Sequence, residues 1–211
     1  MKTPLETVNG SAIAEPEDVL GFWFRGVGSG GLPSDDAVRR WFMGGADFDQ
    51  ETRLLFESTV DAALEGDLGC WAETPRGILA LVIVLDQLTR NVYRGNAKAF
   101  AGDTRAIGYT RHALGQRLHE RFQPIERYFL YMPLEHAEDV EAQRQAVALF
   151  EALACDAPSG APSFFQNGVD WARKHQAVIE RFGRFPARNA ALGRTSTPDE
   201  EIFLQANPRG F

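Results

Sequence analysis

Apolar residues recur along most of this chain at spacings of three, four and seven positions, the period of a helix that buries one face. Residues 48–66 follow this pattern and end in a glycine, which often terminates helices. The inward positions predicted for this segment are Phe48, Leu55, Phe56, Thr59 and Ala63. Because strand signals are nearly absent, the sequence predicts an all-α protein.

A second long helix is predicted over residues 164–183. Its inward positions are Phe165, Val169, Ala172, Val178 and Ile179. The preceding segment, residues 155–163, is rich in Pro, Gly and Ser and is predicted to be a loop between helices.

The most apolar stretch of the chain is ILALVIVL, residues 78–85, which has no polar face. Thr74 and Pro75 precede it as helix cap and first-turn residue, and the helical pattern continues to Asn91. Valine and isoleucine also favour strands, but the cap, the length and the lack of hairpin partners favour a helix. We therefore expect residues 75–91 to form a buried central helix.

Helix start signals mark further elements. Pro16 opens one helix, Ser34 can cap the next, and Thr197-Pro198-Asp199-Glu200 combines a capping box with a first-turn proline. In the middle of the chain, Asp103 is expected to cap a helix that runs to about His119. Pro124 opens another helix, which Pro133 is expected to interrupt, and residues 138–153 form the next.

At 211 residues the chain is long enough for one sizeable core and short for two. We expect a single all-helical domain over residues 1–211, with residues 1–14 disordered. The net charge of -7 argues against nucleic acid and anionic membranes as partners, since both attract positive surfaces. With no signal peptide, no membrane span and only two distant cysteines, the sequence predicts a cytoplasmic protein and leaves its oligomeric state open.

The central helix changes character abruptly at its end, where Asp86, Gln87, Arg90 and Asn91 follow the apolar run. Asp86 with Arg90, and Gln87 with Asn91, are four residues apart and can pair on the helix surface. Local pairing leaves most of their donors unused, and each buried polar group without a partner costs about 1–3 kcal/mol. Other segments must therefore supply partners.

One candidate partner segment is RFGRFPARNAALGR, residues 181–194, in which four arginines occur without an acid. Arg184 and Arg188, with Asn189 beside them, need a counter-charge that Asp86 or an anionic ligand could supply. The alternative is a purely structural network. Arginine outnumbers lysine 19 to 3 in the whole chain, so an arginine here is not by itself evidence of anion binding.

The other candidate is PLEHAED, residues 133–139, which is predicted to begin a helix after a proline. Glu135 and His136 could form a general base or contribute to a metal site, or they could satisfy the polar groups of the core. Glu138 and Asp139 are interpreted as first-turn acids stabilised by the helix dipole. His175 precedes the arginine segment and can approach the same cluster.

We expect neither a metal nor a cofactor. No recognised ligand spacing such as H-E-x-x-H links the histidines and acids. Residues 26–31, GVGSGG, match G-x-G-x-x-G literally, but they follow a helix instead of a strand and run into Leu-Pro. That segment is interpreted as a loop.

Four motifs carry a resemblance to a known family: LDQLTRN, YMPLEHAED, RFGRFPARNAALGR and W-A-x-T-P-R-G before the central helix. Together they make the chain similar to a largely bacterial family, domain of unknown function 924, from VLGFWF to Phe211. The resemblance implies about nine or ten helices in antiparallel pairs, stacked in a tetratricopeptide-like superhelical arc. It implies no activity and no catalytic residues. Leu88-Thr89 departs from the Phe-Pro that is more usual in that family.

Two functional hypotheses follow. In the first, the three polar segments converge into a pocket for a small anionic molecule, where Arg184 and Arg188 hold the anion and Asp86 and Gln87 orient them. Glu135 or His136 is then the candidate acid or base. In the second, the protein is a helical scaffold that binds a peptide or protein partner, and the polar cluster only joins the helices.

Overall fold

The computed structural model describes residues 12–28, 30–157 and 162–207. The expectations for residues 1–11, and those for residues 158–161 of the inter-helix loop, lie outside these ranges. Regular structure in the described ranges is helical, with no β-strand and one isolated bridge between Val27 and Pro33. The all-α prediction is confirmed.

The described ranges contain ten α-helical segments, in keeping with the nine or ten predicted. They are α1 (Pro16–Trp23), α2 (Asp35–Met43), α3 (Gly45–Glu65), α4 (Pro75–Val82), α5 (Thr89–Val92), α6 (Asp103–Gly115), α7 (Pro124–Glu135), α8 (Val140–Cys155), α9 (Pro162–Phe182) and α10 (Pro198–Ala206). Short 3-10 helices lie between them: η1 (Gly69–Glu73), η3 (Ala97–Phe100), η4 (Leu118–Arg121) and η5 (Pro186–Arg188). A π-helical segment, η2 (Ile83–Leu88), joins α4 to α5.

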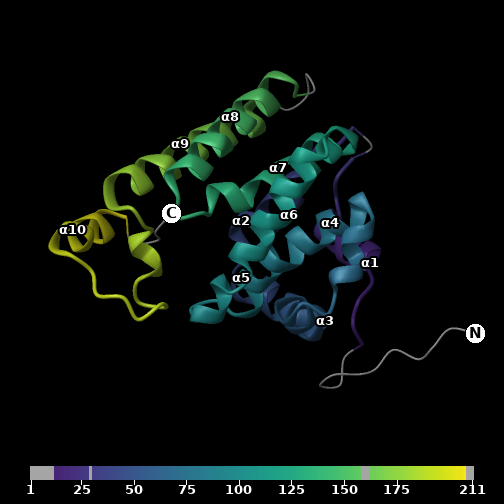
Figure 1. Cartoon of the computed structure of the whole chain (residues 1–211), viewed down its shortest axis with the longest axis horizontal. Helices are drawn as coiled ribbons and strands as arrows, with labels where there is room; N and C mark the ends of the chain where they lie inside the picture. Colours follow the sequence, from purple (N-terminus) through teal and green to yellow (C-terminus); the bar gives the residue numbers. More distant parts are fainter. Residues whose placement is uncertain (1–11, 29, 158–161, 208–211) are drawn as a thin grey trace, which may run out of the picture.

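The predicted central helix is present as one continuous rod made of α4, η2 and α5. Residues 77–89 of this rod are all buried, and it packs against α1, α3, α6 and α7. Figure 1 shows the rod within the part of the molecule formed by α1 to α7. Thr74 caps the rod by accepting a hydrogen bond from the Gly77 amide at 3.0 Å. The local signals read from the sequence are therefore confirmed for this element.

The π-helical turn within the rod was not predicted. Its wider turn shifts backbone hydrogen bonds away from the regular pattern. The hydroxyl of Thr89 donates to the carbonyl of Val84 at 2.7 Å, and Arg90 donates to the carbonyl of Asp86 at 2.8 Å. Side chains thus satisfy carbonyls at the point where the rod turns from apolar to polar residues.

The amino terminus of α6 lies directly against this turn. A Cβ atom on Gly102 would lie 2.2 Å from the carbonyl oxygen of Leu85, closer than any side chain tolerates. Glycine at this position lets α6 approach the rod, and it places Asp103, the first residue of α6, beside Arg90.

The second half of the chain extends from this core. Helices α8 and α9 lie side by side, and α7 packs against both (Figure 1). Phe165, Val169 and Ala172 of α9 join the main core, while Val178 and Ile179 form a smaller apolar cluster with Phe185. The inward face predicted for residues 164–183 is confirmed. The tetratricopeptide-like arc stays a prediction.

Several predicted helix boundaries were wrong. Pro133 does not interrupt its helix, because α7 continues through it to Glu135. The cap of α6 is Gly102 instead of Asp103. That helix ends at Gly115, short of His119, because Arg117 takes a left-handed conformation.

Two other details differ from the sequence-based expectation. Leu55 of α3 is 49% exposed, although the other inward positions predicted for that helix are buried. The loop after α8 is shorter than expected, because Cys155 ends α8 and Pro162 begins α9. No helix in the described ranges has the length and apolar character needed to cross a membrane.

Candidate functional site

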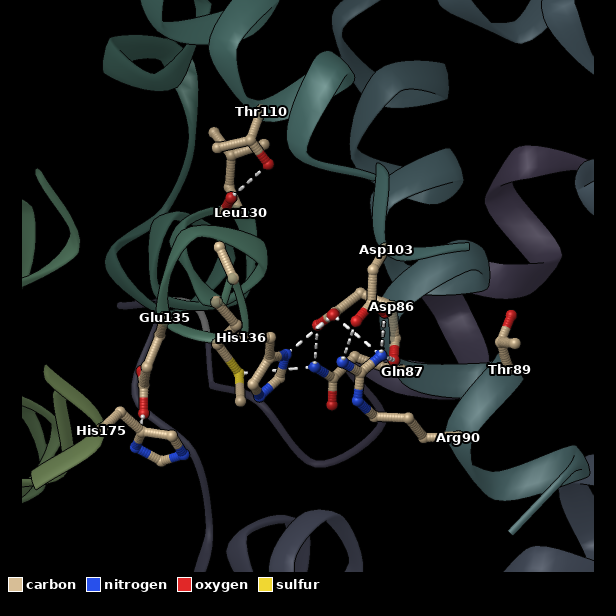
Figure 2. A network of polar contacts seen from close by, with 12 residues as sticks. Asp86, Gln87, Thr89, Arg90, Asp103, Thr110, Leu130, Glu135, His136 and His175 are labelled. Atoms are coloured by element: carbon tan, nitrogen blue, oxygen red, sulfur yellow. Dashed lines mark hydrogen bonds and ion pairs between the residues drawn. The ribbon is translucent and has the colours of Figure 1, made fainter. Parts of the chain in front are cut away.

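The carboxylate of Asp86 is the centre of a buried polar cluster at the end of the rod (Figure 2). Its side chain is fully buried, and its Oδ1 atom lies 3.1 Å from Nη1 of Arg90 and 2.7 Å from Nδ1 of His136. Burial by itself would raise the pKa of Asp86, but Arg90 and then His136 outweigh it and hold that pKa well below its usual range. Asp86 is therefore an anion at neutral pH.

This anion fixes the orientation of the His136 imidazole. Because a carboxylate only accepts hydrogen bonds, Nδ1 of His136 must carry the proton that joins the two groups. In the neutral ring the lone pair is then on Nε2. Within the described residues Nε2 has no hydrogen-bond partner, and the ring lines a cavity. His136 is thus held in the orientation of a base or nucleophile.

Two arginines from distant parts of the chain meet at Asp103. Arg90 contacts this carboxylate through both terminal nitrogens, at 2.8 and 3.1 Å. Arg188 donates from Nη1 to Oδ2 of Asp103 at 3.1 Å, the same oxygen that accepts from Nη2 of Arg90. One carboxylate oxygen therefore sets the spacing of the two guanidinium groups.

The guanidinium of Arg188 is held by hydrogen bonds and by two aromatic rings. Nη2 donates to the backbone carbonyl of His136 at 2.8 Å, and the group lies 4.8 Å from the Phe100 ring centroid and 4.5 Å from that of Phe185. Burial, together with repulsion from Arg90, lowers the pKa of Arg188 to about 10. The side chain remains a cation at neutral pH, with Asp103 as its ion-pair partner.

A second histidine–carboxylate pair lies next to the first. Nδ1 of His175 is 2.9 Å from Oε1 of Glu135 and 2.9 Å from the carbonyl of Trp171. Burial disfavours the charged ring, but the contact with Glu135 outweighs burial and raises the pKa of His175. Oε2 of Glu135 has no hydrogen-bond partner within the described residues. The centroids of the His136 and His175 rings are 6.2 Å apart.

The prediction that Glu135 and His136 begin a helix was wrong. Glu135 is the last residue of α7 and His136 its C-cap, while α8 begins at Val140 with Asp139 as its N-cap. A carboxylate is destabilised at the carboxyl end of a helix by the helix dipole. A protonated His175 would therefore stabilise the charged form of Glu135. The Glu135 and His175 side chains point toward one another in Figure 2.

A cavity of about 410 Å³ opens onto these groups. Its polar lining includes Arg90, Arg188, His136 and His175, and its apolar lining includes Phe100 and Phe185. It lies where the end of the rod, the end of α7 and η5 come together. The predicted convergence of the three polar segments is therefore confirmed. Where they meet, arginine side chains lie beside a histidine.

Gln87 and Asn91 lie at the edges of this arrangement. The amide of Gln87 donates to Oδ2 of Asp86 and contacts the sulfur of Met132 at 3.6 Å. Asn91 donates to Asp49 of α3 at 2.8 Å, and Asp49 also pairs with Arg94, a cavity-lining residue. Gln87 orients Asp86, while Asn91 connects the rod to α3.

Arg184 and Asn189 belong to a different network, outside the cavity lining. Arg184 forms a two-point ion pair with Glu200 of α10, at 2.7 and 2.8 Å. Asn189 donates to the same carboxylate and accepts from Arg194. Of the two counter-charges considered for the arginine segment, Asp86 forms no ion pair with Arg184 or Arg188, because Arg184 pairs with Glu200 and Arg188 with Asp103.

Sequence reasoning missed two acids that position the site. Asp103 was interpreted only as a helix cap. Glu138 was interpreted as a first-turn acid, but its carboxylate accepts from the Phe185 amide at 2.8 Å and pairs with Arg194 at 2.6 and 2.9 Å. The surplus of arginines in residues 181–194 was the available signal that acids elsewhere must face them.

Metal ligation is not suggested by the geometry of this site. Among the residues that the structure describes, no three His, Cys, Asp or Glu side chains come close enough together to hold a metal ion.

Comparison with known proteins relates the chain to uncharacterised relatives. A family model described as bacterial protein of unknown function (DUF924) matches residues 19–208. The fold is similar to the solved structure of ATU0120, a protein of unknown function from Agrobacterium tumefaciens, with a TM-score of 0.76 and 31% sequence identity. The similarity covers 90% of this chain and 97% of that one. The comparison with curated proteins gives no match.

Proposed function

This chain belongs to the bacterial DUF924 family of unknown function, and we propose that it binds a small anionic molecule in the cavity beside Arg90, Arg188 and His136. The single observation that carries the proposal is the arginine pair. Two guanidinium groups share one oxygen of Asp103 at the wall of a cavity, and both line that cavity.

Electrostatics support an anion at this place. The pKa of Arg188 is lowered to about 10, with burial as the main cause and repulsion from Arg90 second. An anion in the cavity would oppose the lowering of this pKa, since it would add negative charge beside Arg188, whose ion pair is with the carboxylate that Arg90 also contacts. Arginine forks also match carboxylate and phosphate groups in geometry.

The size and lining of the cavity support an organic anion. Ligand cavities commonly measure about 300–1,000 Å³ and combine apolar walls with a few convergent polar groups. The volume of about 410 Å³ lies in this range, and Phe100 and Phe185 provide apolar walls next to the arginines. His136, and Glu135 acting through His175, are the groups from which a catalytic acid or base would come.

The alternative function is a helical scaffold for a peptide or protein partner, with a structural polar cluster. It is favoured by the ion pairs within the cluster. Arg90 pairs with Asp86 and Arg188 pairs with Asp103, so each arginine has a carboxylate partner without a ligand. In that case ligand binding would be absent, and substitution of Arg188 would change only the stability.

Isothermal titration and thermal shift with phosphate, phenylphosphonate and benzoate test the proposal. The wild-type protein should bind at least one of these anions saturably. Arg188→Ala should weaken binding about 10-fold to 100-fold, the equivalent of one charge-assisted contact of about 1.5–3 kcal/mol. Arg184→Ala is the matched control, since it also breaks an arginine–carboxylate pair but lies outside the cavity lining.

Two results would contradict anion binding at this site. One is the absence of any saturable binding to the wild-type protein. The other is equal affinity of the wild-type protein and Arg188→Ala. Arg188→Lys, which keeps the charge but loses the fork, should lie between them.

A further inference from the structure

We propose that His136 is the nucleophile of a phosphate monoester hydrolase, which forms a phosphohistidine intermediate at Nε2. This inference rests on the proposed anion site and assigns its ligand to the phosphate monoesters. The observations that carry it are the position of His136 in the lining of the cavity that both arginines also line, and the chemistry of the residues around that cavity.

His136 is connected to each of the two arginines, to Arg90 through the contact of its ring with Asp86 and to Arg188 through its backbone carbonyl. Its Nδ1 bonds to Asp86, which pairs with Arg90, and its backbone carbonyl accepts from Arg188 at 2.8 Å. Because the His136 ring and both guanidinium groups line one cavity, an anion held by the arginines would share that cavity with the ring. With the proton on Nδ1, a neutral ring has its lone pair on Nε2, which has no hydrogen-bond partner among the described residues and is the atom that can attack.

The arginine pair suits a phosphoryl group. Nη2 of Arg90 and Nη1 of Arg188 each use one N–H on the same oxygen of Asp103, and each carries a second N–H. Two donors whose spacing is set by one oxygen atom can bind two oxygens of one phosphoryl group. The remaining part of a phosphate monoester then lies against Phe100 and Phe185, which line the same cavity.

His136 is also the best nucleophile that the cavity contains. The described residues that line it include no Ser, Thr, Cys, Asp, Glu, Lys or Tyr. The other histidine, His175, has its Nδ1 on Glu135, and this contact raises the pKa of the ring and favours its protonated form. A protonated ring cannot attack, but it can donate a proton.

The reaction has two steps. In the first, the Nε2 lone pair of His136 forms a bond to phosphorus, the P–O ester bond breaks, and the leaving oxygen takes a proton from the His175 imidazolium. The positive charge that develops on the His136 ring faces the carboxylate of Asp86, which stabilises it. In the second, water attacks phosphorus, the N–P bond breaks, and the water proton returns to His175. The products are an alcohol and inorganic phosphate.

The experiment uses the full chain with p-nitrophenyl phosphate as substrate. After an alkaline quench, because phosphohistidine is labile in acid, mass spectrometry should find phosphate on His136. His136→Ala should lower turnover about 1,000-fold or more, and added imidazole should restore part of it. His112→Ala, at an exposed histidine outside this cavity, should retain wild-type turnover.

A parallel binding measurement with phenylphosphonate separates this inference from the proposed function. Binding without turnover, or turnover that persists in His136→Ala, would overturn the phosphohistidine mechanism and leave the anion site in place. Failure of phenylphosphonate, phosphate and benzoate alike to bind would overturn both. Recovery of turnover by imidazole would support a chemical role for His136, since a misfolded variant does not regain activity in this way.

Discussion

Oδ2 of Asp103 lies 3.1 Å from Nη1 of Arg188, and this ion pair joins the first residue of α6 to the last residue of η5. The same carboxylate holds Arg90 at the end of the central rod. The arrangement of the cavity wall therefore depends on Asp103, although this acid does not contact His136 directly. Because Asp103 holds Arg90 and Arg188 in place, both cations are ordered without a ligand.

Removing this acid should cost stability. Asp103→Ala leaves Arg90 and Arg188 close together without the carboxylate between them, and breaking such a partly buried pair should lower the free energy of unfolding by about 3 kcal/mol. Urea denaturation measures the change. Asp170→Ala, at an exposed position of α9, should stay within about 0.5 kcal/mol of wild type. Equal effects of the two substitutions would contradict a role for Asp103 in joining the helices.

A methyl group on Gly102 should disturb the same junction from the backbone side. Because the Cβ would lie 2.2 Å from the Leu85 carbonyl, Gly102→Ala must push α6 away from the rod. The expected loss is at least about 1–3 kcal/mol, with weaker anion binding. Gly108→Ala on the same helix has no atom within 4 Å of its new Cβ and should be neutral or stabilising. If Gly102→Ala behaves like Gly108→Ala, the close approach is not needed.

The Glu135–His175 pair should make stability depend on pH. The folded-state pKa of His175 is raised. The stability that this pair contributes is therefore complete below the unfolded pKa of about 6.5, and it is lost as the pH rises through the folded-state pKa. Glu135→Gln removes the cause of that rise. The difference in unfolding free energy between wild type and Glu135→Gln should therefore be larger near about pH 6 than near about pH 9. A difference that is constant over this range would contradict the assignment.

Glu138 should control the loop that carries Phe185. Its carboxylate accepts the Phe185 amide and pairs with Arg194, and these contacts outweigh burial and lower its pKa. Glu138→Gln should lower stability by about 1.5–3 kcal/mol and speed hydrogen exchange at the Phe185 amide. The stability that ionised Glu138 contributes is present above its unfolded pKa of about 4.3. It disappears as the pH falls through the lowered pKa of the folded state.

The control for this substitution is Glu141→Gln. Glu141 is 82% exposed and makes one contact of 3.7 Å with Arg144, so its loss should leave both stability and exchange unchanged. Unchanged exchange at the Phe185 amide in Glu138→Gln would show that the loop is held by other contacts.

The sequence by itself determined the elements whose signals are local. Thr74 and Pro75 start the rod, Gly66 ends α3, and the capping box at Thr197 starts α10, as predicted. The buried rod was also predictable, because an apolar stretch without a polar face can only be placed inside a core. The same stretch marked the site, since its polar end had to find partners in other segments.

Tertiary structure alone decided which partners meet. Arg184 and Arg188 are four residues apart in similar surroundings, yet Arg184 pairs with Glu200 and Arg188 with Asp103 at the cavity. That choice depends on how η5 is placed against α10, on the bonds of Arg188 to Asp103 and to the His136 carbonyl, and on the close approach of Gly102 to Leu85. Ion pairing carries no sequence period, and each arginine fork accepts any carboxylate within reach. Only the packing of the helices determines which carboxylate that is.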